Sequence, residues 1–376
     1  MIKAIVNAKI VTSEEILDGY TLIFNKKIIS IQIEVPFNIE TIDAKGAYLS
    51  AGFIDIHIHG SNGADVMDAT YSSLETISNS LIKTGVTSFL ATTMTMSKDR
   101  ILEALLNIKK YRNSVTGAKI LGVHLEGPFI NPTKSGAQNS KYILKPDIKF
   151  IEEYLDIIKL ITLAPEVEGA REFILYLKKN YPYILLSIGH SSSNYKQTKE
   201  SFKWGISHAT HLFNAMNPLH HREPNIIGAV LEDDNISCDI IADTIHIHPS
   251  LFKILFKLKD DKLILITDAM RAGCLYDGEY SLGGQRVFVK NGEARLRDGT
   301  LAGSVLKLNS ALKNFKNYSN ISLPKLISMV TSTPAKRLNL NLGELKEGYP
   351  ADMVLFDSNF NIIKTFIGGS LVVNYH

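Results

Sequence analysis

Histidines and carboxylates follow several short apolar runs in this chain, and their spacing is typical of metal ligands. In GFIDIHIHG, His57 and His59 are two residues apart, so both side chains face the same way in a strand. In GVHLEGP, His124 and Glu126 share a face for the same reason. Imidazole nitrogens and carboxylate oxygens are common zinc ligands. Glu126 alone could instead cap a helix or form a salt bridge, but beside the histidines a metal centre is favoured.

Three further polar residues end later apolar runs. His190 lies in SIGHSS, His211 in ATHLFNAM and Asp268 in LILITDAM. His208 lies three residues before His211 and would point the other way on a straight strand, so we expect it to be structural. For Asp268, the alternative is an ordinary surface acid.

These residues together predict metal-assisted hydrolysis. Glu126, His190 and His211 supply the three ligands of a catalytic zinc site that keeps one position open for water. His57 and His59 could hold a second ion. Water on such a metal is a nucleophile near neutral pH, and Asp268 could take its proton and pass it to a leaving group.

Strands and helices alternate through the middle of the chain, which predicts a parallel sheet. The predicted strands are 52–59, 87–92, 119–125, 160–164, 184–188, 206–211, 237–242 and 262–267. The predicted helices are 72–84, 98–111, 169–181, 194–204, 249–259 and 304–318. Eight such units fit a (β/α)8 barrel, whose strand ends converge on one rim and would bring the histidines together. A doubly wound sheet is the alternative, but no G-x-G-x-x-G run follows a predicted strand.

Short β-prone runs mark both ends of the chain, at 2–10, 21–24 and 27–33 and again at 353–357, 362–367 and 370–374. A sheet built jointly by the two ends would bracket an inserted domain. We therefore expect a small β-sandwich domain from residues 1–51 and 338–376, around a catalytic barrel at 52–337.

Composition excludes several classes of protein. The 376 residues carry a net charge of +3, with 45% hydrophobic and 21% charged residues, so the chain can bury a core and has no basic footprint for nucleic acid or membrane. No run approaches the ~18 apolar residues of a membrane span. Two cysteines argue against a disulfide scaffold and fit a reducing compartment, so we expect a cytoplasmic protein.

Several runs, taken in order, resemble the N-acetylglucosamine-6-phosphate deacetylases, a family within the amidohydrolase superfamily. They are HLEGPF, LAPE, IGH, THLFNAM, HREP, IADTIH, ITDAM and LAGS. The matches run in family order from about residue 47 to residue 305, and the turn at 348–352 fits too. Other superfamily members bridge two metals with a carbamylated lysine after strand four. Here LAPE offers no lysine, which weakens a dihydroorotase or hydantoinase interpretation, and Glu126 could take over the bridging role. Glu166 in that run has two possible roles, behind the site or at a helix start.

The resemblance implies a substrate and a set of roles. Members of this family remove acetate from N-acetylglucosamine 6-phosphate with the help of one or two divalent ions, Zn²⁺ or Fe²⁺. Carried over, Glu126, His190 and His211 bind the catalytic metal, Asp268 is the acid and base, and His246 polarises the acetyl carbonyl. The remaining substrate contacts are Ala137, Gln138, Asn214, Ala215 and Arg222.

Arg222 also carries an implication for assembly. In this family the arginine can reach in from a neighbouring subunit, which implies a homodimer, and guanidinium binds phosphate in a bidentate manner. A surface salt bridge with Glu223 is the alternative. For the whole protein, the alternatives are hydrolysis of another small anionic amide and a non-catalytic, amidohydrolase-like binding protein.

Overall fold

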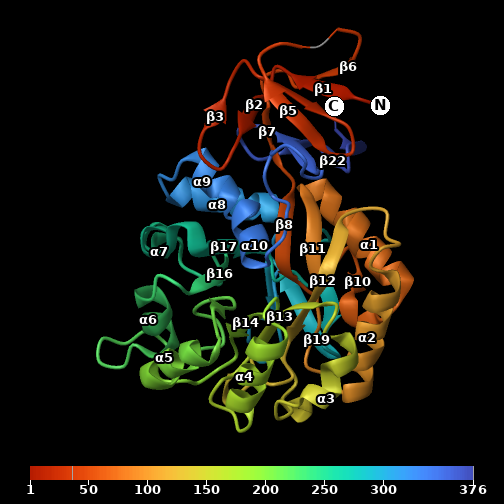
Figure 1. Cartoon of the computed structure of the whole chain (residues 1–376). Helices are drawn as coiled ribbons and strands as arrows, with labels where there is room; N and C mark the ends of the chain where they lie inside the picture. The colour runs from red at the N-terminus through yellow and green to blue at the C-terminus, as the bar shows by residue number, and fades with distance from the viewer. Residues whose placement is uncertain (36, 376) are drawn as a thin grey trace.

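A parallel eight-stranded barrel forms the centre of the computed structural model, which describes residues 1–35 and 37–375 (Figure 1). Each strand pairs with the next one along the chain. The strands are β8 (Phe53–Ile58), β11 (Val86–Thr92), β12 (Lys119–Glu126), β13 (Ile158–Leu163), β14 (Leu185–Ile188), β15 (His208–Ala209), β16 (Ser237–Ile241) and β17 (Leu263–Ile266). The predicted barrel is therefore confirmed, with strand boundaries shifted by a few residues.

The first and last barrel strands meet just beyond their C-terminal ends. Ile58 forms a parallel bridge with Ala269. The backbone N–H of Asp268 donates to the carbonyl of His57 at 2.9 Å, and that of His59 donates to the carbonyl of Ala269 at 2.9 Å. These bonds close the barrel at the level of the predicted ligands.

Amphipathic helices cover the outside of the barrel (Figure 1). α8 buries Leu308, Ala311, Leu312 and Phe315, whose i, i+3, i+4, i+7 spacing makes one apolar face. The principal helices are α1 (Tyr71–Leu81), α2 (Lys98–Tyr111), α4 (Ala170–Asn180), α5 (Tyr195–Trp204), α6 (Asn225–Glu232), α7 (Phe252–Lys259) and α8 (Leu308–Tyr318). Shorter helices are α3 (Ile148–Ile151), α9 (Leu323–Ser328) and α10 (Ser332–Arg337). Within the described part of the chain, no helix has both the length and the apolar character to cross a membrane.

One predicted helix starts later than expected. The prediction placed its start at Ser304, whereas α8 begins at Leu308. Ser304 instead bridges Ala269, and its hydroxyl donates to the carbonyl of Thr267 at 2.6 Å. The segment before α8 is therefore used to support the loop that carries Asp268.

The two ends of the chain lie together at one end of the molecule (Figure 1). One sheet has the order β23-β22-β21-β7-β2-β3, in which β7 (Tyr48–Ala51) pairs antiparallel with β21 (Met353–Phe356). A second sheet has the order β5-β4-β1-β6. The other strands are β1 (Lys3–Val6), β2 (Lys9–Val11), β3 (Ile16–Leu17), β4 (Thr21–Phe24), β5 (Ile28–Gln32), β6 (Glu40–Asp43), β22 (Ile362–Ile367) and β23 (Ser370–Asn374).

These two sheets share a buried apolar core. Leu22 and Phe24 of β4 lie in one cluster with Leu49 of β7, Met353 of β21 and Phe366 of β22. Segments from both ends of the sequence thus bury each other's apolar side chains. The boundaries proposed for the two domains, which run to His376 outside the described residues, stay a prediction.

An antiparallel sheet that sequence reasoning missed follows β17. Its strands are β18 (Gly278–Leu282), β19 (Gln285–Lys290) and β20 (Glu293–Arg295). The two-residue turns Gly283-Gly284 and Asn291-Gly292 all have positive φ, between 52° and 81°. Gly-Gly and Asn-Gly between β-prone runs are hairpin signals, so this sheet could have been predicted. Gln285 Nε2 donates to the carbonyl of Ala137 at 2.6 Å and thereby ties the hairpin to the rim of the barrel.

Candidate active site

Glu126 lies where the predicted metal ligands converge. It is the last residue of β12 and only 2% exposed. His190 follows β14, His211 follows β15, and both point Nε2 at Glu126 Oε1, at 3.2 and 3.0 Å. The two Nε2 atoms are 3.1 Å apart. The three residues predicted from strand-end position therefore do meet.

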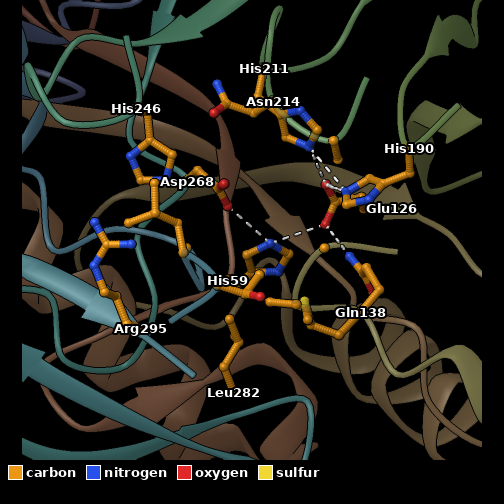
Figure 2. A pocket seen from close by; sticks show the side chains of 17 residues that line it. His59, Glu126, Gln138, His190, His211, Asn214, His246, Asp268, Leu282 and Arg295 are labelled. Atoms are coloured by element: carbon orange, nitrogen blue, oxygen red, sulfur yellow. Dashed lines mark hydrogen bonds and ion pairs between the residues drawn. The ribbon is translucent and has the colours of Figure 1, made fainter. Parts of the chain in front are cut away.

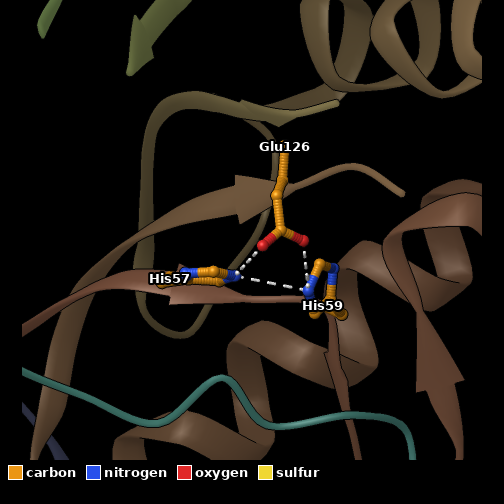
Figure 3. Close-up of side chains that lie close together, drawn as sticks. All are labelled: His57, His59 and Glu126. Atoms are coloured by element: carbon orange, nitrogen blue, oxygen red, sulfur yellow. Dashed lines mark hydrogen bonds and ion pairs between the residues drawn. The ribbon is translucent and has the colours of Figure 1, made fainter. Parts of the chain in front are cut away.

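A second group shares the same carboxylate (Figure 3). His57 and His59 stand on one face of β8 and its end, with their Nε2 atoms 3.4 Å apart. His59 Nε2 lies 3.2 Å from Glu126 Oε2, and His57 Nε2 lies 3.4 Å from Glu126 Oε1. Each group of three offers ligand atoms that all lie within 4.8 Å of one another. Glu126 thus stands between two candidate ion positions.

Three of the converging residues adopt left-handed backbone angles. His190 has φ 48°, His211 φ 34° and Asp268 φ 48°. Residues with a Cβ rarely adopt this region, and such strain persists where the surrounding structure holds it in place. Each of the three follows a parallel strand. At each of these residues the left-handed turn directs the side chain away from the strand and into the centre of the rim.

The charges in the cluster depend on one another. Burial raises the pKa of Glu126, but the neighbouring His57 and hydrogen bonds with His190 and His211 outweigh it and hold the pKa well below its usual value. Burial alone would raise the pKa of Asp268 as well. The charge of His57 and a hydrogen bond with His59 outweigh burial, so the pKa of Asp268 lies below its usual value. For His59, burial lowers the pKa, while hydrogen bonds with Asp268 and Glu126 drive it well above the ordinary value. The carboxylates of Glu126 and Asp268 are therefore ionised, and their negative charge attracts cations to the centre of the site.

The donor set fits a divalent cation. His190 Nδ1 lies 2.9 Å from the carbonyl of Lys134, and His59 Nδ1 lies 3.3 Å from that of Thr92. A carbonyl only accepts, so it holds the proton on Nδ1 and leaves the Nε2 lone pair directed at the centre. Lone pairs from imidazole and oxygen from a buried carboxylate are the ligands that zinc and iron(II) take in proteins.

A cavity of about 330 Å³ opens above these residues (Figure 2). Of the predicted site residues, it is lined by His59, Glu126, Ala137, Gln138, His190, His211, Asn214, Ala215, His246 and Asp268. Asn214 Nδ2 is buried there and has no hydrogen-bond partner among the residues that the structure describes. A buried amide donor costs free energy unless a ligand or water accepts its hydrogen bond, so this atom is available to donate to a molecule in the cavity.

His246 lies on the opposite wall from His190 (Figure 2). Its Nδ1 is 2.6 Å from Asp243 Oδ2, and the Asp243 carboxylate also accepts the backbone N–H of His246 at 2.8 Å. Asp243 therefore fixes the ring from behind. Nε2 has no partner among the described hydrogen bonds and is available to a bound molecule.

Gln138 makes contacts within the protein that the sequence did not indicate. Its Nε2 donates to Glu126 Oε2 at 2.6 Å, and its Oε1 accepts the backbone N–H of Thr95 at 2.6 Å. The amide thus orients the shared carboxylate. Its predicted contact with the substrate stays a prediction.

Arg222 is the predicted substrate residue that this chain does not bring to its own cavity. It lies exposed on the loop before α6 and contacts His221 Nε2 through Nη1 at 2.7 Å. Among the described ion pairs it has none with Glu223, the predicted surface alternative.

Sequence reasoning missed a further cation. Arg295, the last residue of β20, lines the cavity and is anchored by Glu293 Oε2 and the carbonyl of Gly299, both at 2.7 Å. The missed β18–β20 sheet also contributes Leu282 to the wall. Arg295 sits on a surface hairpin with no motif around it, so only the tertiary structure places it here.

His208, expected to be structural, lies below the site. Its ring bonds to Ser237 Oγ at 2.7 Å and Asp239 Oδ2 at 2.9 Å. Asp239 also accepts the backbone N–H of His211. The pair therefore supports the strained turn at His211.

Residues 48–372 match the model of the amidohydrolase family. Over 377 aligned residues the chain is 40% identical to the N-acetylglucosamine-6-phosphate deacetylase of Bacillus subtilis, covering 96% of this chain and 95% of that one. The chain belongs to the amidohydrolase family. Another amidohydrolase, the N-acetylgalactosamine-6-phosphate deacetylase of Escherichia coli O157:H7, is 33% identical, with 96% and 97% of the two chains covered.

Solved amidohydrolases share the whole architecture. The N-acetylglucosamine-6-phosphate deacetylase of Pasteurella multocida is 31% identical and superposes with a TM-score of 0.94 over 99% of each chain. A mutant of the Mycobacterium smegmatis deacetylase, solved in complex with N-acetyl-D-glucosamine-6-phosphate, is 26% identical with a TM-score of 0.92 over 100% of this chain and 99% of that one. As an amidohydrolase, the protein is a metal-dependent enzyme. The two groups of residues around Glu126 that could hold a metal ion agree with this.

Proposed function

We propose that this protein hydrolyses the acetamide of N-acetylglucosamine 6-phosphate to glucosamine 6-phosphate and acetate. The observation that carries the proposal is one cavity that holds a metal-ligand group, an ionised acid and an unpartnered amide donor. A cavity of about 330 Å³ is of the size that holds a small ligand. The relatives named for this reaction cover nearly the whole chain.

Glu126, His190 and His211 would hold the catalytic ion, and His57 and His59 with Glu126 a second one, either as Zn²⁺ or as Fe²⁺. When bound, a divalent ion polarises the amide carbonyl and lowers the pKa of water. Gln138 keeps the shared carboxylate of Glu126 in place through its 2.6 Å hydrogen bond.

Asp268 carries the proton through the reaction. Its Oδ1 lies 3.2 Å from His59 Nε2, and its lowered pKa keeps it ionised and ready to accept a proton. It takes a proton from the attacking water as the water oxygen bonds to the carbonyl carbon. It then gives that proton to the amine nitrogen while the C–N bond breaks, so acetate and the free amino sugar leave.

His246 stabilises the negative charge that develops on the carbonyl oxygen. Asp243 holds the ring of His246 through Nδ1, which leaves Nε2 as the atom that would polarise that oxygen. The donor is fixed before the reaction starts, so no reorganisation is needed as the charge forms.

The polar end of the cavity binds the sugar phosphate. Asn214 Nδ2 donates to it beside Ala215, while Ala137 and Gln138 border the sugar ring. Arg222 is exposed on its own chain and reaches the phosphate of a second copy, which makes the protein a homodimer. The exposed position and the absence of Arg222 from its own cavity lining support this arrangement.

The test is acetate release by purified protein loaded with Zn²⁺ or Fe²⁺, beside a chelator-treated control. N-Acetylglucosamine 6-phosphate, its galacto epimer and the unphosphorylated sugar are compared, because one relative is named for the epimer. We expect metal-dependent release with the highest kcat/KM for N-acetylglucosamine 6-phosphate. Preference for the epimer would reassign the substrate, equal rates without phosphate would reject the phosphate contacts, and no release from metal-loaded protein would overturn the proposal.

A further inference from the structure

Glu166 lies behind the site, between the strands that carry two of the metal ligands. It follows β13, which pairs with β12 on one side and β14 on the other. β12 ends in Glu126 and β14 leads to His190. Glu166 is not among the residues that line the cavity, so we place it behind the site rather than in contact with the substrate.

The Glu166 carboxylate accepts hydrogen bonds from the segment that follows His190. Its Oε1 accepts the backbone N–H of Ser192 at 2.7 Å, and its Oε2 accepts the hydroxyls of Ser191 at 2.7 Å and Ser193 at 2.8 Å. Asn131 Nδ2 also donates to Oε1, at 2.9 Å. Three consecutive serines and one asparagine thus converge on a single side chain.

The same asparagine connects this carboxylate to His190 itself. The backbone N–H of Asn131 donates to the carbonyl of His190 at 2.9 Å. His190 has φ 48°, a conformation that costs free energy for a residue with a Cβ and that its surroundings must hold. Glu166 holds the residues after His190 directly and the His190 carbonyl through Asn131, so the C-terminal side of the strained turn is fixed.

A helix-capping role does not explain these contacts. α4 begins at Ala170 after Gly169, which makes no side-chain cap, and the described hydrogen bonds of Glu166 all run to the 191–193 segment and Asn131. An acid that served only the helix would direct its oxygens at the first backbone N–H groups of α4. The alternative of a helix-start acid is therefore unsupported.

We infer that Glu166 is a positioning residue for the ion held by Glu126, His190 and His211. It fixes the left-handed turn at His190 and so keeps Nε2 of that ring aimed at Glu126, 3.2 Å from its oxygen. Groups that orient a metal ligand from behind typically affect metal affinity or activity by about 10- to 100-fold. The inference rests on the proposed metal site and reaction.

The test compares Glu166→Gln with Glu168→Gln, which changes an exposed glutamate two positions away that pairs only with Lys145 among the described contacts. Zn²⁺ affinity is measured by chelator competition on metal-free protein, together with kcat, KM and the Tm of the metal-free form. We expect Glu166→Gln to weaken binding of one Zn²⁺ about 10- to 100-fold and to lower kcat more than KM changes, with Tm little altered. Glu168→Gln should match the wild type.

Ser193→Ala is the second variant, because it removes one hydroxyl from Glu166 and leaves the carboxylate in place. It should weaken Zn²⁺ binding in the same direction and by less. Unchanged Zn²⁺ affinity in both Glu166→Gln and Ser193→Ala would overturn the inference, as would a loss of affinity fully matched by a lower Tm of the metal-free protein. If the wild type releases no acetate but Glu166→Gln still weakens Zn²⁺ binding, the proposed reaction fails and the positioning role stands.

Discussion

Asp268 donates its backbone N–H to the carbonyl of His57 at 2.9 Å, across the seam where the last barrel strand meets the first. The proposed proton carrier and a proposed metal ligand are therefore held in register by the closure of the barrel. Their side chains meet as well, with Asp268 Oδ1 3.4 Å from His57 Nε2. Barrel closure thus couples directly to the geometry of the site.

Asp268→Asn should nearly abolish turnover while leaving the metal bound. An amide of the same shape keeps the backbone bond to His57 but cannot accept the proton of water, and general acid–base groups typically contribute 10²- to 10⁴-fold. We expect kcat to fall by about 10³-fold, measured by acetate release, with metal content determined in parallel. A variant with normal kcat would refute the role given to Asp268.

Metal removal should abolish activity, and the affinity of the protein for Zn²⁺ should depend on pH. In the metal-free protein, hydrogen bonds with Asp268 and Glu126 outweigh burial and raise the pKa of His59, so its ring keeps a proton to a higher pH than usual. The metal must displace that proton, so Zn²⁺ affinity should rise with pH through the neutral range and binding should release protons. Chelator competition at about pH 6 and 8 checks this; equal affinity at both would contradict it.

Arg295→Ala should weaken substrate binding more than it slows the reaction. Arg295 brings a cation to the cavity wall, and its anchors at Glu293 and Gly299 leave other N–H groups available to an anionic molecule. Loss of a charge-assisted hydrogen bond typically costs about 1.5–3 kcal/mol, so we expect KM for the phosphorylated sugar to rise about tenfold or more. Arg297→Ala, an exposed arginine on the same hairpin, is the control and should leave KM unchanged.

Asp352→Asn should destabilise the fold without touching the site. Asp352, between the terminal sheet and the barrel, accepts Lys119 Nζ at 2.6 and 2.8 Å and the backbone N–H of Gly368 at 2.7 Å. Loss of hydrogen bonds to a charged group that is mostly buried predicts a fall of about 1–3 kcal/mol in the free energy of unfolding, measured by urea denaturation. Glu168→Gln, which breaks a largely exposed pair with Lys145, should leave the free energy of unfolding unchanged.

Thiol labelling should distinguish the two cysteines. Burial raises the pKa of the Cys238 thiol to about 12, whereas Cys274 is partly exposed. Only the thiolate reacts, so near pH 8 a thiol reagent should label Cys274 in the native protein and Cys238 only after denaturation. Labelling of Cys238 at the same rate as Cys274 would show that the barrel opens readily.

The periodicity of the chain predicted the barrel because each strand and helix carries its own local signal. The run 98–111 predicted α2 to the residue, since its apolar positions recur at helical spacing and its ends are polar. The β18–β20 hairpins carried an equally local signal in Gly283-Gly284 and Asn291-Gly292, but they were not among the strands predicted from the sequence. α8 began later than predicted because Ser304 is recruited to the Asp268 loop, a contact between distant parts of the chain.

The sequence by itself determined the types of the candidate metal ligands and their place at strand ends, because parallel barrel strands send their C-terminal ends to one rim. His57, His59, Glu126, His190 and His211 follow from that rule. Only the tertiary structure decided which residues surround these candidate ligands. Gln138, Glu166 and Arg295 lie on loops or hairpins, and the path of such segments depends on contacts with distant parts of the chain. Hydrogen-bond partners at a loop are set by packing rather than by local propensity, so that second layer of the site could only be seen once the chain was folded.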